Sequence, residues 1–164
     1  MPMKTASVLT VSDSCAQGER EDRSGPAVAE LLRQNGYEIL QQRIVADEQD
    51  QIEQTLISLA QQAQLVVSTG GTGITSRDLT PEATRAVCSR LVDGIPEKMR
   101  AEGLRRTPFA ALSRGLCGVC GQALVLNLPG SPEGASQSLL AVLDILPHAI
   151  DLLAGKTAHE VSNG

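Results

Sequence analysis

The sequence predicts an α/β sandwich built on a mostly parallel sheet. Two observations favour this class: short apolar runs alternate along the chain with helical patterns, and those runs end in polar or glycine-rich loops. Of the 164 residues, 41% are hydrophobic and 20% are charged, which is enough apolar sequence for a packed core. Because no repeat, low-complexity block or linker interrupts the chain, we treat residues 1–164 as one domain.

The chain begins with a strand followed by a helix. Residues 7–11 are a β-branched apolar run that stops at polar Ser12-Asp13, which is typical of a strand. Gly25-Pro26 then opens a helix with proline in its first turn, and Gly36 ends it.

A second strand and helix follow directly. Residues 37–45 predict the strand. The helix begins at Asp47, and from Ile52 to Ala63 its apolar residues recur at i, i+4, i+7, i+8 and i+11, which is an amphipathic stripe.

The middle of the chain predicts a third strand and two helices. The strand covers residues 65–69 and runs into Gly70-Gly71-Thr72-Gly73. Thr80-Pro81-Glu82 is typical of a helix start, with an N-cap hydroxyl, proline at the first helical position and an acid in the first turn. Residues 96–106 predict the other helix, whereas residues 107–121 hold too many glycine and turn residues to assign.

The C-terminal part predicts one more strand and a long helix. Residues 123–128 form a buried strand that Pro129-Gly130 ends. Ser131-Pro132-Glu133 repeats the helix-start pattern, and the apolar helix after it reaches Leu153 with a bend at Pro147.

Charge and aromatic content exclude several kinds of partner. The formal net charge is -5, and no run of Lys or Arg residues is longer than the pair Arg105-Arg106. The chain therefore lacks the basic stripe that nucleic-acid binding requires. Tyr37 and Phe109 are its two aromatic residues, too few for a base-stacking platform. No apolar run approaches the ~18–20 residues of a membrane span, and the N-terminus turns polar before a signal-peptide core is complete. We therefore expect a cytoplasmic protein with neither a nucleic-acid nor a membrane partner.

The four cysteines are too few for a secreted disulfide framework. Cys117-Gly-Val-Cys120 has the spacing of half a zinc site, but no second pair follows, and His148 and His159 lie on or beyond another predicted element. Free thiols are the favoured interpretation, and a zinc site is the alternative.

Acids and glycines follow the predicted strands. Asp13, Asp47 and Asp78 come after the first three strands, Gly70–Gly73 directly follow the third, and Pro129-Gly130-Ser131 follow the last. Because ligands of open parallel sheets bind outside the carboxyl ends of the strands, we expect these residues to converge on one rim.

This composition indicates magnesium-dependent chemistry at a phosphate. Glycines between a strand and a helix let backbone N–H groups point at a common anion. Carboxylates beside a phosphate need a cation, and Mg²⁺ is held by one or two carboxylates together with phosphate oxygens. The P-loop and dinucleotide motifs do not occur, and neither histidine can be placed near a nucleophile.

Each candidate also has a purely structural explanation. Asp47 could cap a helix. Asp78 could be a turn residue, and Asp22 and Ser24 could be solvated loop residues. The loop glycines could serve a tight turn alone, and Ser131 is better explained as a helix cap than as a ligand.

Five motifs, in this order, resemble the MogA/MoaB family of molybdenum-cofactor biosynthesis proteins, which is related to the G domain of gephyrin. They are Thr10-Val-Ser-Asp-Ser14, Asp22-Arg-Ser-Gly-Pro26, Thr69-Gly-Gly-Thr-Gly73, Arg77-Asp-Leu-Thr-Pro-Glu-Ala-Thr84 and Leu126-Asn-Leu-Pro-Gly130. The resemblance runs from the first strand to about Gly155. It implies a three-layer α/β/α sandwich, usually a homotrimer, that binds molybdopterin.

The resemblance also implies an activity and its residues. Molybdopterin and MgATP would give adenylyl-molybdopterin and pyrophosphate, ahead of molybdate insertion, for which a separate protein is a candidate partner. Asp47 and Asp78 match the two acids needed for the transfer and are the candidate Mg²⁺ ligands. The positions implied for substrate and nucleotide binding are Asp13, Asp22, Ser24 and Gly25 along the shared pocket, Gly70, Gly71, Thr72 and Gly73 at the nucleotide phosphates, Ser113 at the pterin side, and Pro129, Gly130 and Ser131 at the pocket edge.

Two other functions stay open at this point. A MoaB-type member would be a non-catalytic molybdopterin-binding or scaffolding module. A nucleotide hydrolase, like the related domain of competence-damage proteins, would release AMP from ATP-derived substrates without the pterin. Two acids near a phosphate favour the enzyme, because a pure binder has no need of them.

Overall fold

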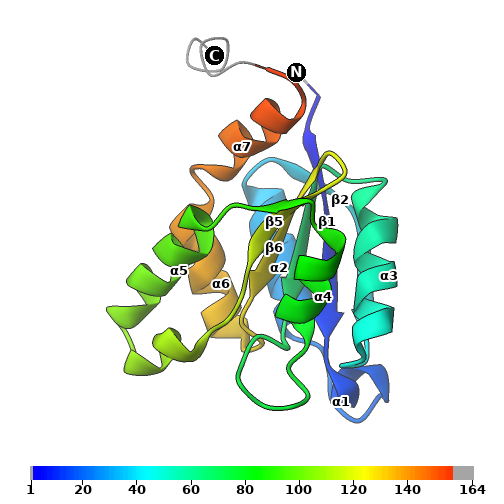
Figure 1. The fold of residues 1–164 in the computed structure, drawn as a ribbon, viewed down its shortest axis with the longest axis vertical. Coiled ribbons are helices and arrows are strands. Elements are labelled where there is room, and N and C mark those ends of the chain that lie inside the picture. The colour runs from blue at the N-terminus through cyan, green and yellow to red at the C-terminus, as the bar shows by residue number, and fades with distance from the viewer. Residues whose placement is uncertain (1, 157–164) are drawn as a thin grey trace.

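A single sheet organises the molecule. In the computed structural model, which describes residues 2–156, six strands form this sheet and helices cover both of its faces (Figure 1). The strands are β1 (Lys4–Val11), β2 (Tyr37–Val45), β3 (Leu65–Thr69), β4 (Arg90–Leu91), β5 (Cys117–Cys120) and β6 (Ala123–Leu128), in the spatial order β2-β1-β3-β6-β5-β4. The pairs β1–β2, β1–β3 and β3–β6 are parallel, whereas β5 is antiparallel to both β4 and β6. The predicted mostly parallel sheet is confirmed.

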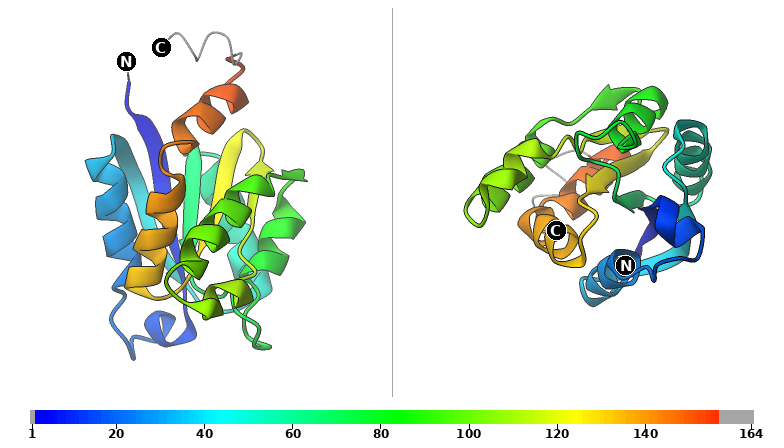
Figure 2. Two further views of the ribbon diagram at one scale, coloured as in Figure 1. Left: turned by 90° about the vertical axis from the view of Figure 1, so that its left-hand side faces the viewer. Right: turned by 90° about the horizontal axis from the view of Figure 1, so that it is seen from below.

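The helices form the two outer layers. They are α1 (Asp13–Ala16), α2 (Ser24–Gln34), α3 (Gln49–Ala60), α4 (Thr80–Val87), α5 (Gly94–Leu104), α6 (Pro132–Val142) and α7 (Leu146–Leu153), with a 3-10 helix η1 at Pro108–Leu112. Figure 2 shows α2, α5 and α6 on one face of the sheet and α3 and α4 on the other. The three-layer α/β/α architecture is therefore confirmed.

Alternation along the strands divides the core between the two faces. In β3, Leu65 and Val67 pack with α2 and α6, whereas Val66 between them packs with α3. Leu124 and Val125 of β6 divide in the same way. Because successive side chains of a strand point to opposite faces, a strand buried on both sides carries apolar residues at consecutive positions, as β3 does at residues 65–67 and β6 at residues 123–126.

Several predicted boundaries differ from the observed ones. The strand predicted at residues 7–11 starts earlier, at Lys4, and α1, β4, η1 and β5 were not predicted. Helix α3 begins at Gln49 rather than at Asp47. Thr80 was predicted as an N-cap, but it lies inside α4 and its hydroxyl donates to the Gly70 carbonyl oxygen (2.9 Å).

The long helix predicted up to Leu153 is interrupted, whereas the bend predicted at Pro147 is confirmed beside that residue. Helices α6 and α7 replace the single helix, with a bend of 66° between them. The break precedes Pro147, which lies in the first turn of α7, where its missing N–H leaves no helical hydrogen bond unmade. Within residues 2–156 no one helix is long and apolar enough to cross a membrane; only the bent pair α6 and α7, counted together, meets that test of length and composition.

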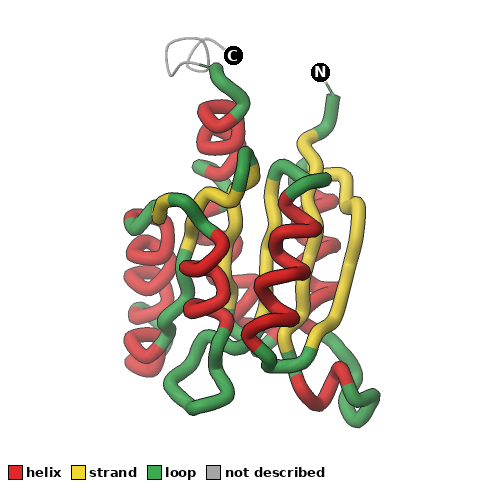
Figure 3. The backbone as a smooth tube through the Cα atoms, turned by 45° about the vertical axis from the view of Figure 1, so that its right-hand side comes forward, coloured by secondary structure: helices red, strands yellow, loops and turns green. Residues whose placement is uncertain are grey.

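A buried amide joins three elements near the ends of the strands. Asn127 of β6 donates to the hydroxyls of Ser68 in β3 and Thr84 in α4 (both 3.0 Å), and its Oδ1 accepts from the N–H of Leu116 (3.0 Å). The carboxyl ends of β1, β3 and β6 meet at the lower edge of the sheet in Figure 1, where α1 and the loop after β3 project. The same loop is the green segment at the lower left of Figure 3.

Candidate functional site

Two cavities adjoin at the carboxyl ends of the strands. The first, which we call the polar cavity, has a volume of about 390 Å³, and its walls include Thr10, Asp22, Asp47, Asp78 and the Gly70-Gly71 turn. Arg20 and Arg23, from the loop between α1 and α2, also line it. It is therefore a cavity with both acidic and basic side chains around a glycine turn.

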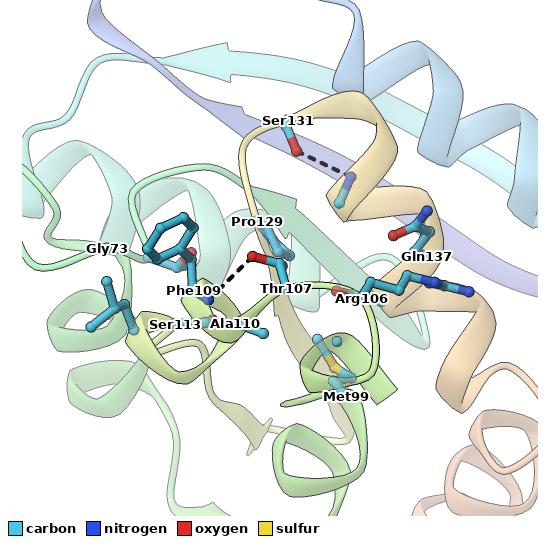
Figure 4. A pocket seen from close by; sticks show the side chains of 15 residues that line it. Gly73, Met99, Arg106, Thr107, Phe109, Ala110, Ser113, Pro129, Ser131 and Gln137 are labelled. Atoms are coloured by element: carbon cyan, nitrogen blue, oxygen red, sulfur yellow. Dashed lines mark hydrogen bonds between the residues drawn. The ribbon is translucent and has the colours of Figure 1, made fainter. Parts of the chain in front are cut away.

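The second, which we call the apolar cavity, has a volume of about 320 Å³. Met99 of α5, Phe109 and Leu112 of η1, and Pro129 supply its apolar walls. Figure 4 shows Phe109 at one end of this cavity, and Arg106 and Gln137 at the other. Ser131 lines both cavities, so a ligand can extend from one into the other.

The glycine turn after β3 forms the wall between the cavities. Gly70 and Gly71 line the polar cavity, and Thr72 and Gly73 line the apolar one. Gly70 and Gly71 have positive φ angles of 93° and 68°. A Cβ atom on Gly70 would clash with the Val11 carbonyl oxygen, so this position needs glycine.

Several N–H groups of this turn are free to bind an anion. Within residues 2–156, the N–H groups of Gly71, Thr72 and Gly73 have no hydrogen-bond acceptor. Consecutive unpaired N–H groups beside a cavity suit phosphate oxygens. Ser131 begins α6 next to them, and its Oγ accepts from the Gly134 N–H (3.0 Å). Ser131 is thus the helix cap that the sequence favoured, and it also faces the cavities.

Asp13 and Asp47 hold each other in place. The Asp13 N–H donates to Asp47 Oδ2, and the Asp47 N–H donates to Asp13 Oδ1, both at 2.9 Å. Arg77 donates to Asp13 Oδ2 (2.9 Å) and to Glu48 Oε1 (3.1 Å). Asp47 is therefore not the helix cap of the structural alternative; its side chain bonds to the backbone of another segment.

The two acids have opposite pKa shifts. Burial raises the pKa of Asp47 above its ordinary value, and the negative charges of Asp13 and Asp78 act in the same direction. The pKa of Asp13 is lowered, first by the N–H of Asp47 and then by Arg77. Of the two carboxylates, Asp47 is thus the one whose ionised form a nearby positive charge would stabilise more.

Asp78 closes a turn in the loop that carries it. Thr75 donates both its N–H (2.9 Å) and its Oγ1 (2.8 Å) to Asp78 Oδ2. Gly73 allows this approach, since a Cβ there would lie 2.8 Å from the same oxygen. Asp78 is indeed a turn residue, and it also lines the polar cavity beside Asp47.

Asp22 and Ser24 are not the solvated loop residues of the alternative interpretation. Asp22 accepts from the Gly25 N–H (3.0 Å) and from the Thr10 hydroxyl (2.7 Å), so it fixes the start of α2 against β1. Ser24 is buried and shares a hydrogen bond with Thr69 of β3 (2.9 Å). A Cβ on Gly25 would clash with Thr10 Oγ1, which explains the glycine there.

The other predicted residues divide between the two cavities. The predicted residues that line the polar cavity are Asp22, Ser24, Asp47, Gly70, Gly71, Asp78 and Gly130. Those that line the apolar cavity are Thr72, Gly73, Ser113 and Pro129, and Ser131 lines both cavities. Asp13 and Gly25 line neither. Asp13 acts on the site through Asp47 and Arg77, and Gly25 acts through Asp22 and Thr10.

The sequence did not single out four arginines that the structure places around the site. Arg20 and Arg23 line the polar cavity, and Arg77 pairs with Asp13. Arg114 donates to the carbonyl oxygens of Gly73 and Asp78 and pairs with Glu82. Arg77 could have been found from the sequence, because it is adjacent to the candidate residue Asp78. Arg114 could not, because it lies in the segment 107–121, whose sequence has no periodicity that predicts a helix or strand.

The two candidate metal ligands each keep one oxygen available. Within residues 2–156, Asp47 Oδ1 and Asp78 Oδ1 accept no hydrogen bond, while Oδ2 of each is anchored. The same residues include no group of three or more His, Cys, Asp and Glu side chains that could hold a metal ion. Two carboxylate oxygens fit Mg²⁺ if phosphate oxygens supply further ligands.

The cysteines lie away from these carboxylates, except for Cys15 at the wall of the polar cavity. All four are free thiols, and Cys117 and Cys120 are buried in β5, as the favoured interpretation predicted. Burial raises the pKa of Cys117 to about 12. His159 of the zinc alternative lies outside the described residues.

The geometry can be compared with known proteins. The family described as "Probable molybdopterin binding domain" matches residues 7–148. The chain is 43% identical over 152 residues to the molybdopterin adenylyltransferase of Helicobacter pylori strain J99, covering 90% of this chain and 86% of that protein. It is 38% identical to the molybdopterin adenylyltransferase of Escherichia coli K12, covering 94% of this chain and 89% of that protein.

The fold is similar to solved structures as well. One is the molybdopterin biosynthesis enzyme MoaB from Thermus thermophilus, with a TM-score of 0.88 and 48% sequence identity. The similarity covers 94% of this chain and 98% of that one. Sequence and structure thus agree over nearly the same length of chain.

Proposed function

The chain belongs to the family of probable molybdopterin binding domains, and from this membership we propose that it is a molybdopterin adenylyltransferase in molybdenum-cofactor biosynthesis. The relatives that carry this name are 38–43% identical over most of the chain. The observation that carries the proposal is that Asp47 and Asp78, from separate segments, line one cavity with the Gly70-Gly71 turn. Adenylyl transfer needs such a combination of phosphate-binding N–H groups and acids.

The proposed reaction exchanges one P–O bond for another. An oxygen of the terminal phosphate of molybdopterin forms a bond to the α-phosphorus of ATP, and the bond from that phosphorus to the bridging oxygen breaks. Pyrophosphate carries away the electron pair. Because the chain holds both phosphates in line, no protein nucleophile is required.

The residues of the chain then position and stabilise charge. The free N–H groups of Gly71, Thr72 and Gly73 would donate to phosphate oxygens, and Arg20 and Arg23 would offset negative charge at the cavity wall. Asp47 and Asp78 would hold Mg²⁺ with their free Oδ1 atoms. When bound, Mg²⁺ neutralises charge that develops on the phosphate oxygens.

The two adjoining cavities support a two-substrate reaction. Phosphate groups fit the polar cavity, which is lined by the acids, the arginines and Gly71 with its free N–H group; the free N–H groups of Thr72 and Gly73 follow on the side of the apolar cavity. A flat ring fits the apolar cavity, whose Met99, Phe109 and Leu112 offer apolar surface and whose Arg106 and Gln137 offer hydrogen bonds. Ser131, which lines both, would lie beside the join between ring and phosphate.

An adenylyl-transfer assay tests the proposal. The purified protein is mixed with molybdopterin, ATP and Mg²⁺, and adenylyl-molybdopterin and pyrophosphate are followed. We expect Asp78→Asn to slow turnover by about 10²- to 10³-fold, because it removes one charge where the transition state needs a cation. Molybdopterin binding should survive, since the asparagine Oδ1 still accepts from Thr75. Asp144→Asn, at an exposed aspartate that lines neither cavity, is the matched control.

Other outcomes favour other functions. No product from the native protein, with molybdopterin still bound tightly, would favour the binding or scaffolding module. AMP released without the pterin would favour the nucleotide hydrolase. Equal product from the native and Asp78→Asn proteins would keep the function and contradict the assigned role of the acid.

Assembly and location belong to the same proposal. We expect a homotrimer, as the resemblance implies, and a cytoplasmic location, as the sequence pattern indicates; a molybdate-insertion protein is a candidate partner. Exposed apolar side chains at Ile74 and Phe109 (68% and 74% exposed) support an assembly that covers part of this surface. Light scattering should give three times the 17.3 kDa chain mass.

A further inference from the structure

Arg114 connects three segments that meet at the wall between the cavities. Its Nε donates to the Gly73 carbonyl oxygen (2.7 Å) and its Nη2 to the Asp78 carbonyl oxygen (2.8 Å). Its Nη1 pairs with Glu82 Oε2 in the first turn of α4 (2.7 Å). A planar guanidinium can satisfy all these acceptors at once, whereas a lysine ammonium cannot match the same fork.

The two carbonyl acceptors lie at the two ends of one loop. Residues 73–78 leave the wall at Gly73 and return to it at Asp78, and Ile74, Thr75, Ser76 and Arg77 between them are exposed. The Arg114 N–H also donates to the Thr72 carbonyl oxygen (2.8 Å), one residue before the loop. Arg114 thus fastens both ends of the loop and the stretch of wall that leads into it.

This loop carries two groups that the proposed reaction uses. Asp78 lies at its end, and Arg77 pairs with Asp13, which in turn fixes Asp47. Inside the loop, Asp78 is anchored to Thr75, another loop residue, so that contact does not attach the loop to the sheet. Attachment beyond the loop comes from Arg114, from the Arg77 pairs, and from the bonds that Thr80 makes to Gly70 and Gly71.

We propose that Arg114 is a positioning residue that bridges the ends of the 73–78 loop and thereby sets where Asp78 lies in the polar cavity. Arg114 follows Ser113, which lines the apolar cavity. One short segment therefore lines the cavity proposed for the ring and also holds Asp78, which lines the cavity proposed for the phosphates. Without the side-chain bridge, the loop would keep the Arg77 pairs and the Thr80 bonds but would lose the contacts to the Gly73 and Asp78 carbonyl oxygens, so Asp78 would shift with it. Displacement of a catalytic group by about 1 Å costs on the order of 10²-fold in rate.

The inference rests on the proposed adenylyl transfer, and its first test is kinetic. Arg114→Met keeps the aliphatic stem and removes every side-chain donor, while the backbone bond from residue 114 to Thr72 remains. We expect kcat to fall by about 10- to 100-fold, with KM for either substrate changed by less than about threefold. Arg114→Lys should recover little of the loss. Glu82→Gln keeps the carbonyl contacts and should stay within about threefold of the native kcat. Arg33→Met removes an exposed arginine with a comparable pair on α2 and is the control.

The second test does not depend on activity. Trypsin cleaves after arginine, so cleavage after Arg77, followed by fragment mass, reports opening of the loop. Cleavage after Arg43, inside β2, reports unfolding of the sheet. We expect Arg114→Met to be cut after Arg77 at least about ten times faster than the native protein, with cleavage after Arg43 unchanged.

The results separate this inference from the proposed function. A native protein without adenylyl transfer would contradict the function, while trypsin would still decide whether Arg114 holds the loop. Native cleavage rates after Arg77 in Arg114→Met would overturn the inference. Equal acceleration after Arg43, or a Glu82→Gln variant as impaired as Arg114→Met, would also overturn it, because the arginine would then support the fold or α4 rather than the loop.

Discussion

Asp13 and Asp47 are neighbours that their surroundings shift in opposite directions. The pKa of Asp13 is lowered by the Asp47 N–H and by Arg77, and burial raises the pKa of Asp47. A bound cation favours the ionised form of a nearby acid. In the proposed enzyme, Asp13 is therefore the acid whose ionised form the protein itself stabilises and which orients its neighbour, and Asp47 is the group whose charge is compensated when the cation binds.

Asp13→Asn should destabilise the protein in a pH-dependent way. An acid whose pKa is lower in the folded protein contributes stability above its unfolded pKa, near 3.8, and loses that contribution as pH falls through the folded value. We expect the variant to melt a few degrees below the native protein at pH 7, and the difference to close below pH 3.8. Thermal unfolding from pH 7 to pH 3 measures this. A difference that stays constant down to pH 3 would show that the loss is not electrostatic.

The glycine turn is the element whose shape the site depends on, and a matched pair of variants tests it. Gly70 and Gly36 both have φ near 90°, but a Cβ at Gly36 would meet nothing within 4 Å, whereas at Gly70 it would meet the Val11 carbonyl oxygen. Gly36→Ala should cost about 1–2 kcal/mol of unfolding free energy from strain alone. Gly70→Ala should cost more and should also abolish adenylyl transfer, because the N–H groups after it would move. Equal losses in urea unfolding would contradict this account of Gly70.

Strands β2, β3 and β6 were more predictable than the helices and than β4 and β5. Each matches its predicted range, because Val, Ile or Leu residues recur along it and a polar, glycine or proline residue lies just beyond its end. β5 contains Cys117-Gly-Val-Cys120, and β4 has two residues, so pairing with neighbouring strands rather than local sequence defines them. The break between α6 and α7 has no glycine or proline inside it, which is why the sequence indicated only a bend at the nearby Pro147 and not the end of a helix.

The candidate site was predictable where residues follow strands and hidden where they do not. Asp47, Asp78 and the Gly70–Gly73 turn are near predicted strand ends, and sheet topology alone brings such ends together. Arg114 reaches the site from a segment without periodicity, through contacts between residues more than 30 positions apart. Such contacts depend on packing, and no local pattern encodes them.

At the scale of the whole molecule, the faces of the sheet form the core, and its carboxyl edge forms the candidate site. Its interior faces carry apolar side chains, while its carboxyl edge gathers Asp22, Asp47 and Asp78 around one cavity. With Glu21, four acids line this cavity against two arginines, so its wall repels a triphosphate unless a further cation intervenes. Binding of ATP to the folded chain should therefore depend on a divalent ion, and this dependence should appear in the stability of the entire protein.

Nucleotide binding should raise the melting temperature only when Mg²⁺ is present. A ligand at 100 times its Kd stabilises the folded state by about 2.7 kcal/mol, which for a chain of this size is a shift of about 5–10 °C. With EDTA in place of Mg²⁺ we expect most of that shift to disappear, because the carboxylates then face the phosphates directly. Asp78→Asn should lose less of its ATP shift in EDTA than the native protein does, since one repelling charge is gone, whereas Asp144→Asn should behave like the native protein. An ATP shift that is the same with Mg²⁺ and with EDTA in the native protein would mean that the acids do not hold a cation at the phosphates.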